Sequence, residues 1–196
     1  MAVSEASAWV RRWAHLVAAG GTVLDLAAGS GRHSAFFAAR GHAVTAVDRD
    51  ATALQGVAGV ATTIVADLEG APWPLPGRRF DAVVVTNYLW RPLLADVLDA
   101  VAPGGVLLYE TFAAGNETVG RPSRPDFLLA RAELVGVAAG LHVVAYEDGF
   151  LIDPERFVQR VVAVRDAGAT TTPRYLLDAG TREARSLESN GSGKSE

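Results

Sequence analysis

The chain has 196 residues, of which 49% are hydrophobic and 20% charged, and its formal net charge is −4. This composition predicts a globular protein, and the net charge provides no broad basic surface for nucleic acid. The absence of cysteine excludes disulfides, thiolate metal sites and cysteine nucleophiles. We expect a cytoplasmic protein, because no apolar run approaches the roughly 18 residues that span a bilayer and the N-terminal segment carries Glu5 and two arginines.

Helix-like and strand-like segments alternate along the chain. Apolar residues recur at helical spacing over Ser4–Ala19, which predicts a helix within residues 1–20 that ends at Gly20 and could serve as a lid. Strands are then expected at 22–27, 43–47, 62–66, 81–86, 106–111, 141–146 and 157–164. Helices are expected at 30–40, 50–57, 91–101 and 127–139, and a proline-rich loop at 71–79.

This alternation of strands and helices is typical of a doubly wound α/β sheet. The last two strands are separated only by a turn-like segment around 148–154, so they should pair antiparallel as a hairpin at or near one edge. We expect a single domain over residues 1–180. Residues 181–196 lack periodicity, which predicts a disordered tail.

A glycine turn follows the first expected strand in the sequence LDLAAGSGRHS, residues 24–34. A dinucleotide-binding fingerprint requires G-x-G-x-x-G, whereas Gly29 and Gly31 are followed by Ser34 at the third position. Asp25, just before the turn, would repel a pyrophosphate but attract an ammonium or sulfonium group. The turn therefore favours a cationic ligand over a nicotinamide dinucleotide.

Two more acidic residues end the next two expected strands. Asp48 could accept hydrogen bonds from both hydroxyls of a ribose, and Asp67 with the backbone N–H of Leu68 could bind the edge of an adenine. Each acid alone could equally be a strand-end or helix-capping residue. Three acids at three successive strand ends favour a nucleoside-binding site.

The stretch DLAAGSG resembles the first motif, D-x-[G/A]-x-G-x-G, of the class I methyltransferases that use S-adenosylmethionine. The resemblance extends over roughly residues 23–164 and implies a Rossmann-like seven-stranded sheet, mostly parallel with an antiparallel C-terminal hairpin. RGHAVTAVDRD and the small size are similar to the tellurite-resistance and thiopurine methyltransferase groups, which act on small soft nucleophiles. With S-adenosylmethionine as the implied cofactor, the expected binding residues are Asp25, Ala27, Gly29, Gly31, Arg32, His33, Asp48, Arg49, Asp67, Leu68 and Asn87.

The methyl acceptor is expected at the exits of the fourth and fifth strands, where the candidate catalytic residues are Asn87, Tyr88, Arg91 and Glu110. Asn87 could hydrogen-bond the acceptor, Tyr88 could wall the methyl path, and Glu110 could act as a base. Alternatively Tyr88 belongs to the core, and Arg91 pairs with Glu110 or Asp96.

Arg121 and Arg124 lie in the long polar loop 113–126, which could clamp an oxyanion or simply be solvated. The scattered histidines show no metal-ligand spacing, so no metal is expected. We expect a methyltransferase of a small molecule, with no membrane or nucleic-acid partner. The alternatives are a methyltransferase of a protein or RNA group, or a non-catalytic module that binds S-adenosylmethionine.

Overall fold

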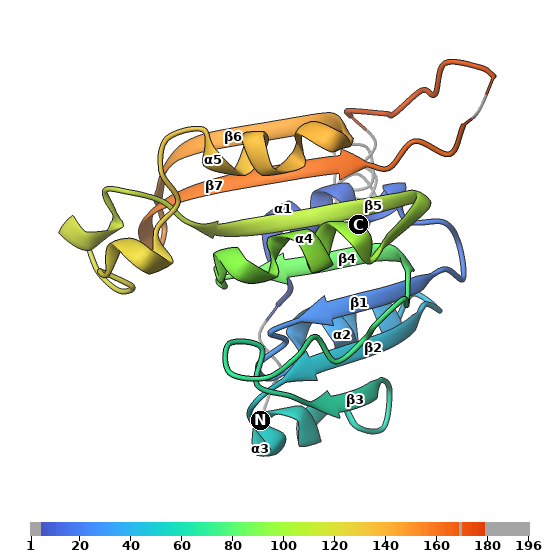
Figure 1. The fold of residues 1–196 in the computed structure, drawn as a ribbon, viewed down its shortest axis with the longest axis horizontal. Coiled ribbons are helices and arrows are strands. Elements are labelled where there is room, and N and C mark those ends of the chain that lie inside the picture. The colour runs from blue at the N-terminus through green and yellow to red at the C-terminus, as the bar shows by residue number, and fades with distance from the viewer. Residues whose placement is uncertain (1–4, 169, 179–196) are drawn as a thin grey trace, which may run out of the picture.

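A computed structural model describes residues 5–168 and 170–178, in which seven strands form one sheet of order β3-β2-β1-β4-β5-β7-β6 (Figure 1). The first five strands are parallel, whereas β7 runs antiparallel to both β5 and β6. This confirms the mostly parallel sheet with an antiparallel C-terminal hairpin at the edge. The strands are β1 Thr22–Leu26, β2 Ala43–Asp48, β3 Thr62–Val65, β4 Phe80–Thr86, β5 Val101–Phe112, β6 His142–Ile152 and β7 Glu155–Val164.

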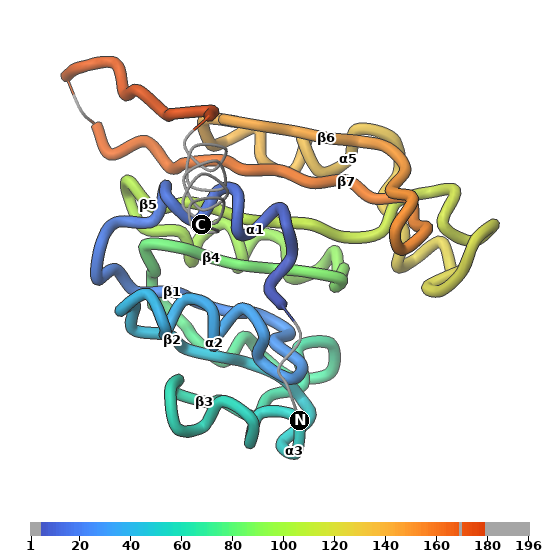
Figure 2. The backbone as a smooth tube through the Cα atoms, turned by 180° about the vertical axis from the view of Figure 1, so that it is seen from behind, coloured from blue at the N-terminus to red at the C-terminus, as the bar shows by residue number. Residues whose placement is uncertain are grey.

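Short helices cover both faces of the sheet. In Figure 1 α4 and α5 lie in front of it, and Figure 2, seen from behind, shows α1 and α2 on the opposite face. The α-helices are α1 Ala8–Trp13, α2 Arg32–Ala38, α3 Ala51–Leu54, α4 Leu94–Asp99 and α5 Glu133–Val137. Single 3-10 turns extend several of them, at Ala14–Leu16, Gln55–Val57, Arg91–Leu93 and Ala138–Gly140.

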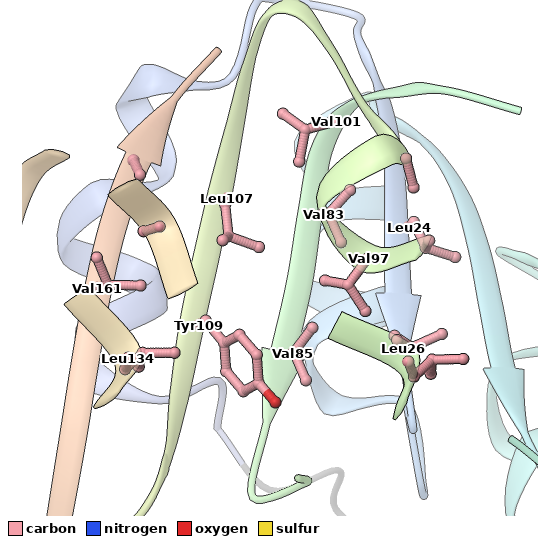
Figure 3. Packing of buried hydrophobic residues seen from close by; sticks show 14 of the residues in the cluster. Leu24, Leu26, Val83, Val85, Val97, Val101, Leu107, Tyr109, Leu134 and Val161 are labelled. Carbon is pink, nitrogen blue, oxygen red and sulfur yellow. The ribbon is translucent and has the colours of Figure 1, made fainter. Parts of the chain in front are cut away.

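Side chains alternate between the two faces of each central strand, so the sheet has a core on either side. On the α4 and α5 side, leucine and valine side chains of β1, β4, β5 and β7 pack around the buried ring of Tyr109 (Figure 3). On the α1 and α2 side, Trp9, Trp13 and Phe37 pack on the valines of β1 and β4. The two cores fix the parallel strands so that their carboxyl ends lie side by side along the same end of the sheet.

Several predicted boundaries are wrong, including that of the helix expected to end at Gly20, whose last helical turn ends at Leu16. The helix expected over 127–139 begins only at Glu133, because Leu129 instead forms a β-bridge with Ala113. The helix expected over 91–101 ends at Asp99, since β5 already begins at Val101. The segment 148–154 is mostly strand, because β6 and β7 remain paired out to Ile152 and Glu155.

No helix of the described residues is long and apolar enough to cross a membrane. The same residues contain no group of three His, Asp or Glu side chains that could hold a metal ion. The predicted tail, 181–196, lies outside the described residues, and the assignment of 1–180 to one domain stays a prediction.

Candidate cofactor and active site

The glycine turn between β1 and α2 has left-handed backbone at three positions, with φ of 53° at Ala27, 53° at Gly29 and 75° at Gly31. A Cβ added to Gly31 would lie 2.4 Å from Cγ1 of Val57. The 3-10 turn Gln55–Val57 can therefore pack against the glycine turn only because residue 31 has no side chain. A Cβ on Gly29 would meet nothing within 4 Å. The main chain of the turn therefore faces open space at Gly29 and close packing at Gly31.

Asp48, at the end of β2, supports this turn from the side. Its Oδ2 accepts a hydrogen bond from the Gly29 N–H at 2.7 Å, and its Oδ1 accepts one from the Asp50 N–H at 2.9 Å. Asp48 is only partly buried. Its carboxylate thus holds the glycine turn and remains within reach of a ligand that approaches the turn.

Asp25 behaves differently from the expectation that it would face a cation. It is 1% exposed, and its Oδ2 accepts hydrogen bonds from the backbone N–H of Ser34 at 2.9 Å and from the Ser34 hydroxyl at 2.6 Å. Burial raises the pKa of Asp25 to about 6, although the Ser34 hydrogen bonds oppose that shift. Asp25 therefore fixes the first turn of α2 behind the glycines, and Ser34 is its partner.

His33 is likewise not placed to meet a ligand. It is 1% exposed, its Nε2 accepts a hydrogen bond from the Ser7 N–H at 3.2 Å, and its Nδ1 lies 3.4 Å from the Thr86 hydroxyl. Burial lowers its pKa to about 3, with a smaller contribution from Arg32. His33 ties the N-terminal segment to α2 and β4. The neighbouring Arg32 is partly exposed and keeps its predicted role as a proposal.

A hollow of about 140 Å³ opens at the carboxyl ends of β1, β2 and β3. It brings together several residues that the sequence analysis singled out, and it adds Ala66 and Glu69, which that analysis missed. Its lining consists of Ala27, Asp48, Arg49, Ala66, Asp67, Leu68, Glu69 and Tyr88. The Asp67 carboxylate stabilises the turn after β3 by accepting a hydrogen bond from the Glu69 N–H at 3.0 Å. Three carboxylates and one guanidinium in this lining favour a positively charged ligand.

A second hollow, of about 180 Å³, adjoins the first and shares Glu69 and Tyr88 with it. It lies at the exits of β4 and β5, where the methyl acceptor was expected. Its lining consists of Glu69, Asn87, Tyr88, Leu89, Thr111, Phe112, Pro122 and Phe127.

Tyr88 lines both hollows and Asn87 lines the second, and both residues follow the end of β4. Asn87 has a left-handed φ of 55°, and its backbone N–H donates to the Glu110 carbonyl at 2.9 Å, which joins the exits of β4 and β5. The Tyr88 hydroxyl is buried without a hydrogen-bond partner among the described residues. Desolvation, followed by nearby Glu69 and Asp67, raises the Tyr88 pKa. A polar atom buried without a partner is costly, so this hydroxyl is suited to a ligand atom.

Arg91 does not reach the acceptor hollow, and it pairs with neither Glu110 nor Asp96. Its guanidinium donates to both carboxylate oxygens of Glu133, at 2.6 and 2.9 Å, and to the carbonyls of Asp126 and Leu128. A bidentate pair of this kind is geometrically specific. The role of Arg91 is to anchor the segment before α5, which spacing in the sequence could not reveal.

Glu110 faces the opposite side of the sheet from Thr111 and is 1% exposed. Its Oε2 accepts a hydrogen bond from Nη1 of Arg160 at 3.3 Å, while Oε1 has no partner in the described part of the chain. Arg160 also pairs with Glu147 and lies 5.1 Å from the ring centre of Trp9. Glu110 thus lies at the buried end of a charged row with Arg160 and Glu147, next to α1, and lines neither hollow.

The loop 113–126 is anchored by a residue to which the sequence analysis gave no special weight. Asn116 is 1% exposed, donates to the Pro122 carbonyl at 3.0 Å and accepts from the Phe157 N–H at 3.2 Å. Arg124 pairs with the exposed Asp126 at 2.8 Å rather than turning into the hollow. The lid roles of this loop and of the N-terminal helix stay predictions.

Part of the chain matches a known family of domains. Residues 23–105 match the model of a methyltransferase domain. TehB from Haemophilus influenzae has the same fold, with 19% identity over 78% of this chain and a TM-score of 0.65, and this chain spans 60% of the TehB chain. No curated protein matches the sequence.

Two further solved structures extend the comparison. A TehB-like SAM-dependent methyltransferase from Corynebacterium glutamicum is 20% identical, over 81% of this chain and 87% of that one, with a TM-score of 0.58. The glycopeptide N-methyltransferase MtfA complexed with S-adenosyl-L-homocysteine is 22% identical, over 83% and 90%, with a TM-score of 0.58. The methyltransferase domain model thus matches residues 23–105, and the described residues share the fold of these solved methyltransferases.

Proposed function

We propose that this chain is a class I methyltransferase that binds S-adenosylmethionine along the glycine turn and the first hollow, and methylates a small molecule in the second hollow. The observation that carries the proposal is that the two hollows adjoin at Glu69 and Tyr88. Donor and acceptor of a methyl group must lie in line and in contact, and two neighbouring hollows with a common wall meet this requirement. The second hollow, about 180 Å³, suits a small acceptor or a small group of one.

The lining of the first hollow fits the proposed cofactor. Asp48 would accept hydrogen bonds from the ribose, and Asp67 and Leu68 would bind the adenine edge, while the open face at Gly29 admits close approach of the ligand to the main chain. The excess of carboxylates favours a sulfonium and an ammonium over an anionic ligand. When bound, the cofactor supplies a methyl carbon on a sulfonium, which a lone pair of the acceptor attacks as the carbon–sulfur bond breaks.

In this proposal the residues at the end of β4 position the reactants. Tyr88 lines both hollows, and its unpartnered hydroxyl would hydrogen-bond a ligand atom there. Asn87 is exposed in the second hollow and would orient the acceptor. Arg91 and Glu110 are not proposed to act on the acceptor, because their side chains are engaged elsewhere.

Calorimetric titration with S-adenosylmethionine tests the proposed cofactor site. Replacing Asp48 by Ala removes a charged acceptor, which is worth about 1.5–3 kcal/mol, so the dissociation constant should rise by about ten- to a hundredfold. The control is Asp99→Ala, at an exposed residue that ends α4 away from both hollows. Unchanged affinity in the Asp48 variant would remove this residue from the site.

A further inference from the structure

The second hollow contains a single charged residue, Glu69. The Glu69 carboxylate is exposed and makes no hydrogen bond or ion pair to any other described side chain. The remaining polar groups around it are uncharged, including the amide of Asn87 and the unpartnered hydroxyl of Tyr88. An acceptor that enters this hollow therefore meets one uncompensated negative charge.

The walls of the same hollow are aromatic and apolar. Tyr88, Phe112 and Phe127 contribute rings, and Leu89 and Pro122 complete the surface. Aromatic faces attract cations through their quadrupole, and an adjacent carboxylate adds to that attraction. This combination of groups suits an apolar molecule that carries an amine.

The arginines that the sequence analysis associated with the two sites do not pair with Glu69. Arg91 is held by Glu133, and Arg124 pairs with Asp126 while lying 5.2 Å from the ring centre of Phe127. Arg49 lines the first hollow only, and Arg121 lines neither. The oxyanion clamp of Arg121 and Arg124 that the sequence allowed is therefore not assembled at the hollow.

On the basis of the proposed function, we infer that the acceptor is an apolar or aromatic small molecule with an amine, which docks against Glu69 between the rings of Tyr88, Phe112 and Phe127. Anionic acceptors, such as carboxylates and oxyanions, are disfavoured because Glu69 repels them and the lining provides no cation. The inference concerns only the group that docks against Glu69. It does not depend on which atom of the acceptor receives the methyl group.

The test uses the full chain saturated with S-adenosyl-L-homocysteine and three probes of similar shape: 2-phenylethylamine, 2-phenylethanol and phenylacetate. Calorimetry at pH 7.5 should show that the amine binds at least about tenfold more tightly than the acid, with the alcohol between them. Glu69→Gln should remove most of this preference, and Glu69→Lys should reverse it. The control Glu155→Lys changes an exposed acid at the start of β7 and should leave the preference intact.

The inference is overturned if the wild-type protein binds phenylacetate as tightly as the amine, if it binds none of the probes, or if Glu69→Lys still prefers the amine. Titration of the same preparations with S-adenosylmethionine separates this result from a failure of the proposed function. A protein that binds the cofactor without a charge preference retains the proposed function and loses only the inference. A protein that does not bind the cofactor loses both.

Discussion

Two buried carboxylates on the same face of the sheet show how differently its two halves are held together. Asp25, on β1, receives both of its hydrogen bonds from Ser34, nine residues away. Glu110, on β5, depends on Arg160, fifty residues away, and leaves one oxygen without a partner among the described residues. Asp25 is thus satisfied within one strand–turn–helix unit, whereas Glu110 depends on a contact between strands that are far apart in the sequence.

The two halves of the sheet should therefore respond differently to substitutions. The half proposed to bind the cofactor contains the glycine turn, which the sequence shows as a motif and which Asp48 and Val57 also contact. The half proposed to bind the acceptor contains pairs such as Glu110 with Arg160 and Arg91 with Glu133, which exist only after the sheet has formed. The following predictions test this difference, beginning with the largest expected effect.

Breaking the long-range pair should be the most damaging change. Arg160→Met leaves the 1% exposed Glu110 without its cationic partner, which should lower the free energy of unfolding by about 3–5 kcal/mol in urea denaturation. Adding Glu110→Gln to this variant should recover part of the loss, because the uncompensated buried charge is removed. Arg124→Met breaks a pair whose side chains are 71% and 66% exposed and should cost less than about 1 kcal/mol. Equal losses in the two arginine variants would contradict the comparison.

In the half of the sheet around β1–β3, the free energy of unfolding should fall strongly when Ala replaces Gly31 and much less when Ala replaces Gly29. Gly31→Ala combines a left-handed φ of 75° with a Cβ that would lie 2.4 Å from Val57, so it should destabilise by about 3 kcal/mol. Gly29→Ala has a similar φ but open space around the added methyl group, so it should cost only about 1 kcal/mol. Urea unfolding of both variants measures the difference, and a Gly29 variant as unstable as the Gly31 variant would refute the packing argument.

The third prediction uses pH to isolate Asp25. Because its pKa is raised from 3.8 to about 6, its contribution to stability is fully present below pH 3.8 and is lost as the pH rises to about 6. Relative to Asp25→Asn, the wild-type protein should therefore lose on the order of 2 kcal/mol between pH 4 and 6. His33 changes stability in the opposite direction, since its lowered pKa removes stability as the pH falls below 6.5. Because His33 is present in both proteins, the difference between them reports Asp25, and a pH-independent difference would show that its carboxyl is not perturbed.

The sequence by itself predicted the doubly wound sheet, the antiparallel hairpin and several of the residues that line the first hollow. These features follow from hydrophobic periodicity and from acids placed at successive strand ends, and Asp48, Asp67 and Leu68 do line one hollow. Parallel strands bring their carboxyl ends to the same edge, so a pattern that is local in sequence is enough to place them.

Only the tertiary structure decided the partners of charged residues and the character of the acceptor hollow. Arg91 selects Glu133 rather than Glu110 or Asp96, Glu110 turns to the face beneath α1, and Glu69 joins both hollows. The physical reason is that the pair of Glu110 with Arg160 depends on strand register and on the face of the sheet, and the pair of Arg91 with Glu133 depends on how two helical segments pack on the sheet. Neither is present in the spacing of residues along the chain, because both arise only when distant segments come together.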